Sequence, residues 1–363
     1  MTVLGSTLPV VIREFGWSYR MAGLMLSGNA AAYFVSTLAS GAVLHRFGLT
    51  FTLGIGLIGQ GVGVLLFGYL PSALINFAWL VLIGLGQGMI EVSANCAALQ
   101  MARRDGGRGM NLLHAAFTIG AVSMPVLSTI TLGSELPWRL VFLISGLLTL
   151  VLAGLALKLE TREGSSGQSS PRRWGGLRDP RLIVCFAVIL LYVGIEMGVS
   201  QWIGEFFFSS GLGGAALASG MISIYWLGIL LGRFGMGYAC RKQQVKSYLV
   251  VYASIALLGL SGFLVVATPV GFAITAFLTG VGLSVIYPMT MLLVGQQQEI
   301  DQGFRVGVVA SGGGVGALLF PLLMGGIADR VGLRATFMFL VATCVLLTLV
   351  CLGNWVASRA AVR

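Results

Sequence analysis

Residues 182–208 have the sequence LIVCFAVILLYVGIEMGVSQWIGEFFF, which is almost continuously apolar. Its charged side chains are Glu196 and Glu205. A membrane-spanning helix needs about 20 consecutive, largely apolar residues. This stretch therefore predicts a transmembrane helix.

Comparable runs recur along the whole chain. The predicted spans lie near residues 20–44, 48–70, 73–100, 110–132, 138–158, 182–208, 214–239, 247–268, 270–295, 305–327 and 335–357. A shorter apolar piece, residues 1–12, precedes them and is too short to cross a bilayer alone. The sequence thus predicts an all-α, multi-pass membrane protein.

The composition excludes most other classes. Of 363 residues, 57% are hydrophobic and 9% are charged, and the mean hydropathy is +0.94. A soluble domain carries about 25% charged residues, so a soluble enzyme is not expected. The net charge of +10 comes from small basic groups between apolar runs. That distribution is typical of cytoplasmic loops in membrane proteins, and a nucleic-acid partner is not expected.

The chain divides into two comparable halves. Residues 159–181 are rich in Gly, Ser, Pro and Arg and predict a linker between a bundle at 1–158 and a bundle at 182–363. Four pairs share one offset of 196 residues: Gly41 and Gly237, Gly84 and Gly280, Gly120 and Gly316, and Pro125 and Pro321. Internal repeats are a sequence mark of secondary transporters.

The same offset puts the start of the first helix about fourteen residues before Met1, since its partner begins near Leu182. We expect two six-helix bundles related by pseudo-symmetry, with the first helix truncated. The alternative is that residues 1–12 form an interfacial stub. One set of alternate loops holds sixteen Lys and Arg and the other holds five, so the linker and the C-terminus are predicted to be cytoplasmic.

Three ionisable residues stand out inside the predicted spans: Glu91, Glu196 and Arg233. Gln87 and Asn95 lie four residues on either side of Glu91 and share its helix face. A charge at bilayer depth costs about 2.5–3.5 kcal/mol on insertion scales, and such residues are usually functional. We interpret Glu91 as a proton-titrating carboxylate and the two amides as solute contacts. The alternative is a structural glutamate between helices.

Tyr192, Glu196 and Ser200 repeat this four-residue spacing, and Gln201 and Trp202 follow. An amide beside an aromatic ring suits a polyhydroxylated ligand, because the ring covers C–H groups while the amide pairs with hydroxyls. Tyr192, Gln201 and Trp202 are predicted solute contacts and Glu196 a second proton site. Trp202 could instead be an interfacial anchor.

Weaker signals lie on other spans. His114 shares a face with Asn111 and Thr118 and is a candidate proton relay or a packing residue. Tyr287 precedes Pro288, and broken helices often line transporter sites, so Tyr287 is a candidate solute contact. We expect Arg233, near a helix end, to extend to the membrane surface. No phosphate-binding loop or metal-ligand spacing is present in the sequence, and we expect no cofactor, metal or enzymatic activity.

The segment GAVLHRFG at residues 41–48 resembles the Gly-x3-Asp-Arg-x-Gly signature of the major facilitator superfamily, with His45 in place of Asp. Within that superfamily the chain is most similar to the fucose:proton symporter family. The segments that carry the resemblance are GQGMIEVSAN at 86–95, NLLHAAFTIG at 111–120 with Pro125, YVGIE at 192–196 with Trp202, and Tyr287–Pro288. The resemblance implies the major facilitator fold, proton-coupled sugar uptake and a proton-coupling role for Glu91. That family's acidic residue in the first helix has no counterpart here.

These features together favour a secondary active transporter, a proton-coupled sugar symporter that works by alternating access as a monomer in the cell membrane. A multidrug or metabolite exporter of the same fold is the first alternative, with Met25, Phe34, Trp226 and Met291 as pocket residues. A truncated, non-transporting remnant is the second.

Overall fold

The computed structural model describes residues 2–105, 108–158, 179–239, 244–295 and 302–360, which are helical apart from short connections and contain no strand. In chain order the helices are α1 (Thr2–Phe15), α2 (Tyr19–Leu66), α3 (Ala73–Asp105), α4 (Arg108–Gly133), α5 (Arg139–Ala156), α6 (Pro180–Ser209), α7 (Ala215–Ala239), α8 (Val245–Gly262), α9 (Pro269–Leu283), α10 (Ile286–Gly295), α11 (Gln302–Val331) and α12 (Leu333–Ala360). The all-helical membrane fold predicted from the sequence is confirmed.

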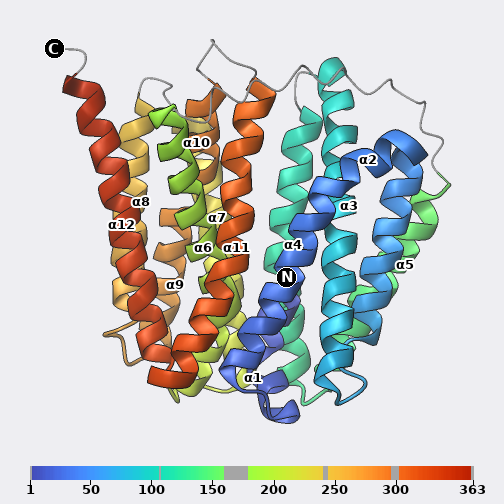
Figure 1. The fold of residues 1–363 in the computed structure, drawn as a ribbon. Coiled ribbons are helices and arrows are strands. Elements are labelled where there is room, and N and C mark those ends of the chain that lie inside the picture. Colours follow the sequence, from blue (N-terminus) through green and yellow to red (C-terminus); the bar gives the residue numbers. More distant parts are fainter. Residues whose placement is uncertain (1, 106–107, 159–178, 240–243, 296–301, 361–363) are drawn as a thin grey trace.

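The helices stand roughly side by side, and those before residue 159 lie beside those after residue 178 (Figure 1). At the boundary between the two groups, α2 packs against α11 and α4 packs against α7. We call the end that holds the C-terminus the proximal end. The opposite end, which contains the turns at residues 16–18 and at Gly332, is the distal end (Figure 1).

Two predicted spans, 20–44 and 48–70, fall within the single element α2. Its backbone leaves the helical region at Gly48, with φ 82° and ψ 172°. This positive φ is readily adopted by glycine because it has no Cβ. The chain reverses there at the proximal end and descends as a second helix (Figure 1).

The predicted span 270–295 is not one continuous helix. It consists of α9 and α10, which are separated at Ser284 and Val285. Pro288 explains the break, because proline lacks an N–H and its ring clashes with the carbonyl four residues earlier, that of Ser284.

The element α1 has 14 residues, which corresponds to about 21 Å at 1.5 Å per residue. It packs against α4, α6 and α7, and so lies between the two groups of helices. Figure 1 shows its far end, the N-terminus, near the middle of the molecule's height.

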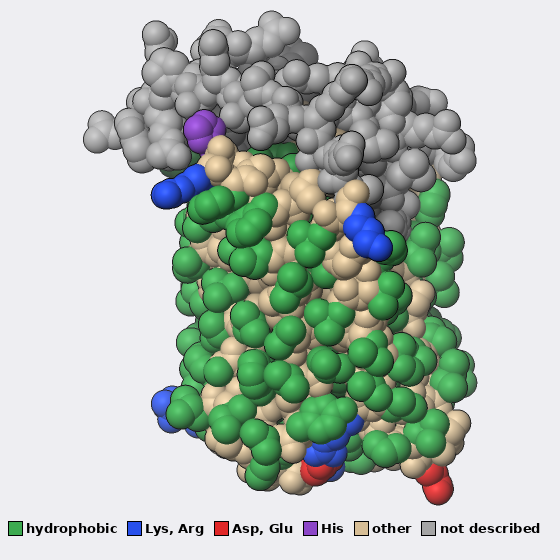
Figure 2. All heavy atoms as spheres, turned by 90° about the vertical axis from the view of Figure 1, so that its right-hand side faces the viewer, with side chains coloured by type: hydrophobic (Ala, Val, Ile, Leu, Met, Phe, Trp, Pro, Cys, Tyr) green, Lys and Arg blue, Asp and Glu red, His purple; other side chains and the backbone are tan. Residues whose placement is uncertain are grey.

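The outer surface suits a bilayer. Figure 2 shows hydrophobic side chains over the central part of one face, with Lys and Arg at both of its margins and Asp and Glu at one of them. Exposed apolar side chains on α5 include Leu147, Leu148, Val151 and Leu155. Nine helices of the described residues are long and apolar enough to cross a membrane. The molecule is a multi-pass membrane protein.

Candidate functional site

Glu196 lies near the middle of α6 and is 7% exposed. The hydroxyl group of Tyr192, one turn earlier, donates a hydrogen bond to its Oε1 atom. Tyr225 of α7 donates to its backbone carbonyl at 3.4 Å. The four-residue spacing predicted that Tyr192 and Glu196 share a face, and their hydrogen bond follows from it.

Arg233 of α7 is the cation beside Glu196. Its Nη2 atom lies 3.7 Å from Glu196 Oε1, and its Nη1 atom donates to Thr118 Oγ1 of α4 at 3.5 Å. The prediction that Arg233 extends to the membrane surface is therefore wrong. Its guanidinium group turns inward because a buried carboxylate and hydroxyl oxygen provide partners there.

Glu91 occupies the other group of helices, on α3. Tyr33 of α2 donates to its Oε2 atom at 2.6 Å. Glu91 is exposed although it lies near mid-helix. Tyr287 of α10, in the opposite half, lies within electrostatic range of both Glu91 and Glu196. The exposed side of Glu91 therefore faces the space between the halves.

The residues that bridge the two halves at mid-depth form what we call the central cluster. Its members are Tyr33, Glu91, Tyr192, Glu196, Arg233 and Tyr287. Tyr192 and Tyr287 bring their rings to 6.2 Å between centroids. The arrangement combines two carboxylates, one guanidinium group and three phenols, so it can hold and move protons and hydrogen-bond a polar solute.

The amides predicted as solute contacts lie in different surroundings. Gln87 and Asn95 are half-buried on α3 with Glu91, and the Oε1 atom of Gln87 is buried without a described partner. Gln201 is 2% exposed. The backbone of α1 passes close to it, since a Cβ at Gly5 would lie 3.2 Å from Gln201 Cα.

Trp202 is 0% exposed and packs edge-on against Tyr19 at 6.0 Å between ring centroids. Full burial in the protein excludes the interfacial-anchor interpretation. Its indole Nε1 atom is buried without a partner in the described part of the chain. Trp202 and Gln201 thus lie beyond the central cluster, toward the distal end.

The candidate proton relay His114 and its neighbour Asn111 have side chains outside the described residues. Two other predicted residues have clear positions. His45 is exposed at the proximal turn beside Gly48. Trp226, proposed for an apolar drug pocket, is 2% exposed and donates to Ser200 at 3.0 Å, within the hydrophobic core.

A second polar group, at the distal end, was missed by sequence reasoning. Glu205 of α6 is 0% exposed. Arg13 of α1 donates to both of its carboxylate oxygens, at 2.8 and 3.0 Å, and Tyr19 donates at 3.0 Å. The backbone N–H of Arg20 donates to Asp329 Oδ2 of α11 at 2.9 Å. Two features of the sequence could have indicated this group. One is Glu205, a carboxylate inside an apolar run, and the other is the GGIADRVG segment at 325–332, which contains Asp329.

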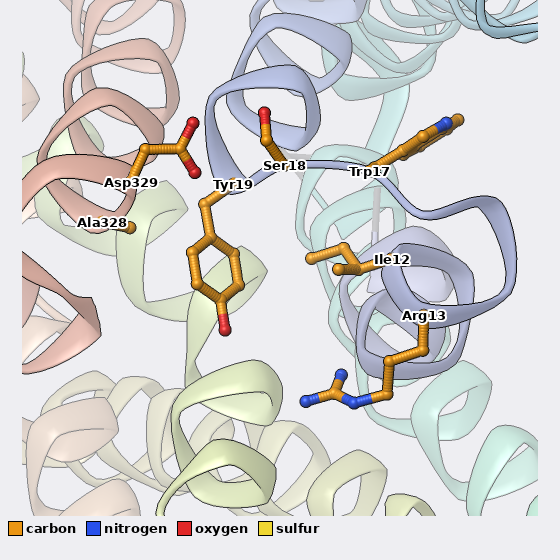
Figure 3. A pocket seen from close by; sticks show the side chains of 7 residues that line it. All are labelled: Ile12, Arg13, Trp17, Ser18, Tyr19, Ala328 and Asp329. Carbon is orange, nitrogen blue, oxygen red and sulfur yellow. The ribbon is translucent and has the colours of Figure 1, made fainter.

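These contacts border a pocket of about 400 Å³ beside the distal turn at residues 16–18 (Figure 3). Its lining residues are Ile12, Arg13, Trp17, Ser18, Tyr19, Ala328 and Asp329. Figure 3 shows the side chains of Arg13 and Tyr19 reaching toward the same region from α1 and α2. The contacts tie α1 and α2 to α6 and α11, so the distal ends of the two halves are fastened together.

Ionisable groups between two packed halves of a helical membrane protein are typical of membrane transporters. A sequence profile of the Major Facilitator Superfamily matches residues 1–297 and 248–360. The chain belongs to this superfamily.

Curated relatives cover much of the chain. It is 25% identical to a glucose/galactose transporter of Brucella abortus over 91% of this chain and 84% of that protein. It is 24% identical to the glucose/mannose transporter GlcP of Bacillus subtilis over 58% of this chain and 55% of that protein.

Solved structures share the fold. A bacterial homologue of the human lysosomal transporter Spinster, described as inward-facing and occupied, superposes with a TM-score of 0.76 at 16% identity, over 99% of this chain and 93% of that one. The nucleoside transporter NupG superposes with a TM-score of 0.75 at 13% identity, over 98% and 96%.

Proposed function

We propose that the protein is a secondary active transporter that moves a monosaccharide together with a proton across the cell membrane. The observation that carries the proposal is the central cluster, in which Glu91 of one half accepts from Tyr33 and Glu196 of the other accepts from Tyr192 beside Arg233. Carboxylates at bilayer depth are costly and are typical of proton pathways.

A sugar is the solute class that fits best. Phenols, amides and carboxylates pair with hydroxyl groups, and aromatic rings cover the C–H faces of a sugar. The relatives named as glucose/galactose and glucose/mannose transporters support this choice.

Alternating access is the proposed mechanism. The residues before the linker and those after it act as two bundles that rock about the central cluster. The fastened distal end, with the Arg13–Glu205 ion pair and the hydrogen bond from the backbone N–H of Arg20 to Asp329, represents the state closed on that side. The excess of Lys and Arg in proximal loops supports a cytoplasmic proximal end, so this state is closed to the outside.

Glu91 is the proposed proton carrier. It is exposed to the space between the halves and accepts a hydrogen bond from Tyr33. A carboxylate in such a place exchanges protons with one side of the membrane and then, after the bundles rock, with the other. Proton loading and sugar binding then favour the same conformational change.

The test is uptake of labelled glucose, galactose and mannose into proteoliposomes under an imposed proton gradient. We expect the wild type to concentrate at least one hexose. Glu91→Gln should lose concentrative uptake and keep exchange of sugar across the membrane, because glutamine preserves hydrogen bonding and cannot titrate. Glu135→Gln, an exposed change in the turn after α4, is the matched control and should behave as the wild type. Concentrative uptake by Glu91→Gln would refute the role of Glu91.

A further inference from the structure

Arg233 contacts three helical elements at once. Its Nη2 atom lies 3.7 Å from Glu196 of α6, and its Nε atom donates to the backbone carbonyl of Ser284 at 3.2 Å. Its Nη1 atom reaches Thr118 of α4, in the opposite half, at 3.5 Å. One guanidinium group therefore joins a buried carboxylate, the end of α9 and the boundary between the halves.

The carbonyl of Ser284 needs a donor for a reason that the sequence shows. In a continuous helix it would accept from the N–H four residues later, but that residue is Pro288, which has no N–H. A buried backbone carbonyl without a donor is costly. Arg233 supplies the missing donor and so completes the hydrogen bonding at the break between α9 and α10.

We propose that Arg233 is a positioning residue that links the charge on Glu196 to the break between α9 and α10 and, through Thr118, to the opposite half of the molecule. This inference rests on the proposed function, because the charge on Glu196 changes only if protons visit the central cluster.

The linkage follows from the chemistry of the guanidinium group. Arginine keeps its proton in proteins, so a proton that arrives at this site binds a carboxylate oxygen of Glu196. The carboxylate then no longer balances the positive charge of Arg233. A half-buried guanidinium group without a negatively charged partner is destabilised at this position. Its hydrogen bonds to Ser284 and Thr118 weaken as a result. Proton binding thereby loosens both the broken helix and a contact between the halves.

The other groups that face Glu196 support this assignment. The titratable ones in the described residues are the phenols of Tyr192, Tyr225 and Tyr287, which are neutral near pH 7. On the α11 side, Phe320 and Met324 contact α6 at Gly194 and Gly198 and are apolar. Arg233 is therefore the cation that balances Glu196 in this part of the structure.

The experiment is an infrared titration of the purified protein in lipid, without solute. The carboxylic-acid C=O band that Glu196→Gln removes is followed against pH. In Arg233→Gln the midpoint of this band should move up by about one to three pH units, as expected when an opposite charge within 4–6 Å is lost. Arg233→Lys keeps the charge and should shift it by less. Arg334→Gln, which removes a distal arginine that donates to Leu264, is the control and should leave it unchanged.

Hydrogen exchange at the backbone amides of residues 285–287 and 289, which flank Pro288, gives a second measurement on the same samples. In the wild type, exchange should rise as the Glu196 band appears. In Arg233→Gln it should be raised at every pH, since the donor to Ser284 is absent. An unchanged band midpoint in Arg233→Gln, or wild-type exchange that is independent of pH, would overturn the inference. Both readings work without transport, so failure of hexose uptake by the wild type would refute the proposed function alone.

Discussion

Arg13 of α1 and Glu205 of α6, which lie 192 residues apart in the sequence, form an ion pair with two hydrogen bonds. Glu205 is fully buried, whereas the side chain of Arg13 is 42% exposed. Arg13 also lies over the ring of Phe208 at 4.1 Å. The pair therefore holds α1 against α6 at the distal end.

Because Glu205 is buried and Arg13 is partly exposed, substitution of one or the other should destabilise the distally closed state by different amounts. Arg13→Gln leaves a buried carboxylate without its cation, which costs about 3–5 kcal/mol in comparable buried pairs. Glu205→Gln leaves an arginine that water can reach, and its effect on the closed state should be smaller. Ile12 lies on the pocket wall and is 7% exposed. Maleimide labelling of a cysteine placed at Ile12 should therefore be fastest in Arg13→Gln.

Glu14 provides a matched control for these variants. It is also near the end of α1, but its partners Trp138 and Arg139 belong to the same group of helices. Its side chain is 38% exposed, and exposed pairs contribute about 0.2–1 kcal/mol. Glu14→Gln should lower thermal stability slightly and leave labelling at position 12 unchanged. Faster labelling in Glu14→Gln than in Arg13→Gln would contradict the role of the Arg13–Glu205 pair.

Gly325 marks a close approach of α11 to α2. A Cβ there would lie 2.5 Å from the carbonyl oxygen of Tyr19 and 3.0 Å from Gly23 Cα. Gly325→Ala should force the two helices apart, disfavour the distally closed state and slow hexose uptake several-fold. Gly326→Ala is the control, since a Cβ at Gly326 meets nothing within 4 Å. Equal uptake rates for the two variants would show that this approach does not limit transport.

Tyr33 should act through Glu91, to which it donates at 2.6 Å. Tyr33→Phe removes the donor and keeps the ring, so we expect a several-fold loss of proton-driven uptake with normal expression. Residues that act through one group have non-additive effects. Combining Tyr33→Phe with Glu91→Gln should therefore be no worse than Glu91→Gln alone, and a further loss in the double variant would indicate an independent role for Tyr33.

The fold could be predicted from the sequence because an apolar run long enough to cross the bilayer must satisfy its own backbone hydrogen bonds, which a helix does. Pro288 also marked a break in its span. The helix boundary near Gly48 was also predicted, since the spans 20–44 and 48–70 meet there, whereas the positive φ of Gly48 cannot be read from a hydropathy pattern.

The candidate site was predicted only in part. The spacing of Tyr192 and Glu196 on one helix is a local property, and their contact followed from it. The partners of Arg233 and Arg13 come from distant segments. Nothing in a single helix indicates whether an arginine turns inward or toward the surface, so these pairs required the structure.

The central claim, that a sugar and a proton move together, is tested most directly by proton flux. Proteoliposomes containing the wild-type protein and an external pH indicator, with no imposed gradient, would receive a hexose that is taken up. If a proton enters with each sugar, the external medium should become alkaline as the sugar enters, and Glu91→Gln should abolish this change. Sugar entry at the wild-type rate with no change in external pH would contradict the central claim.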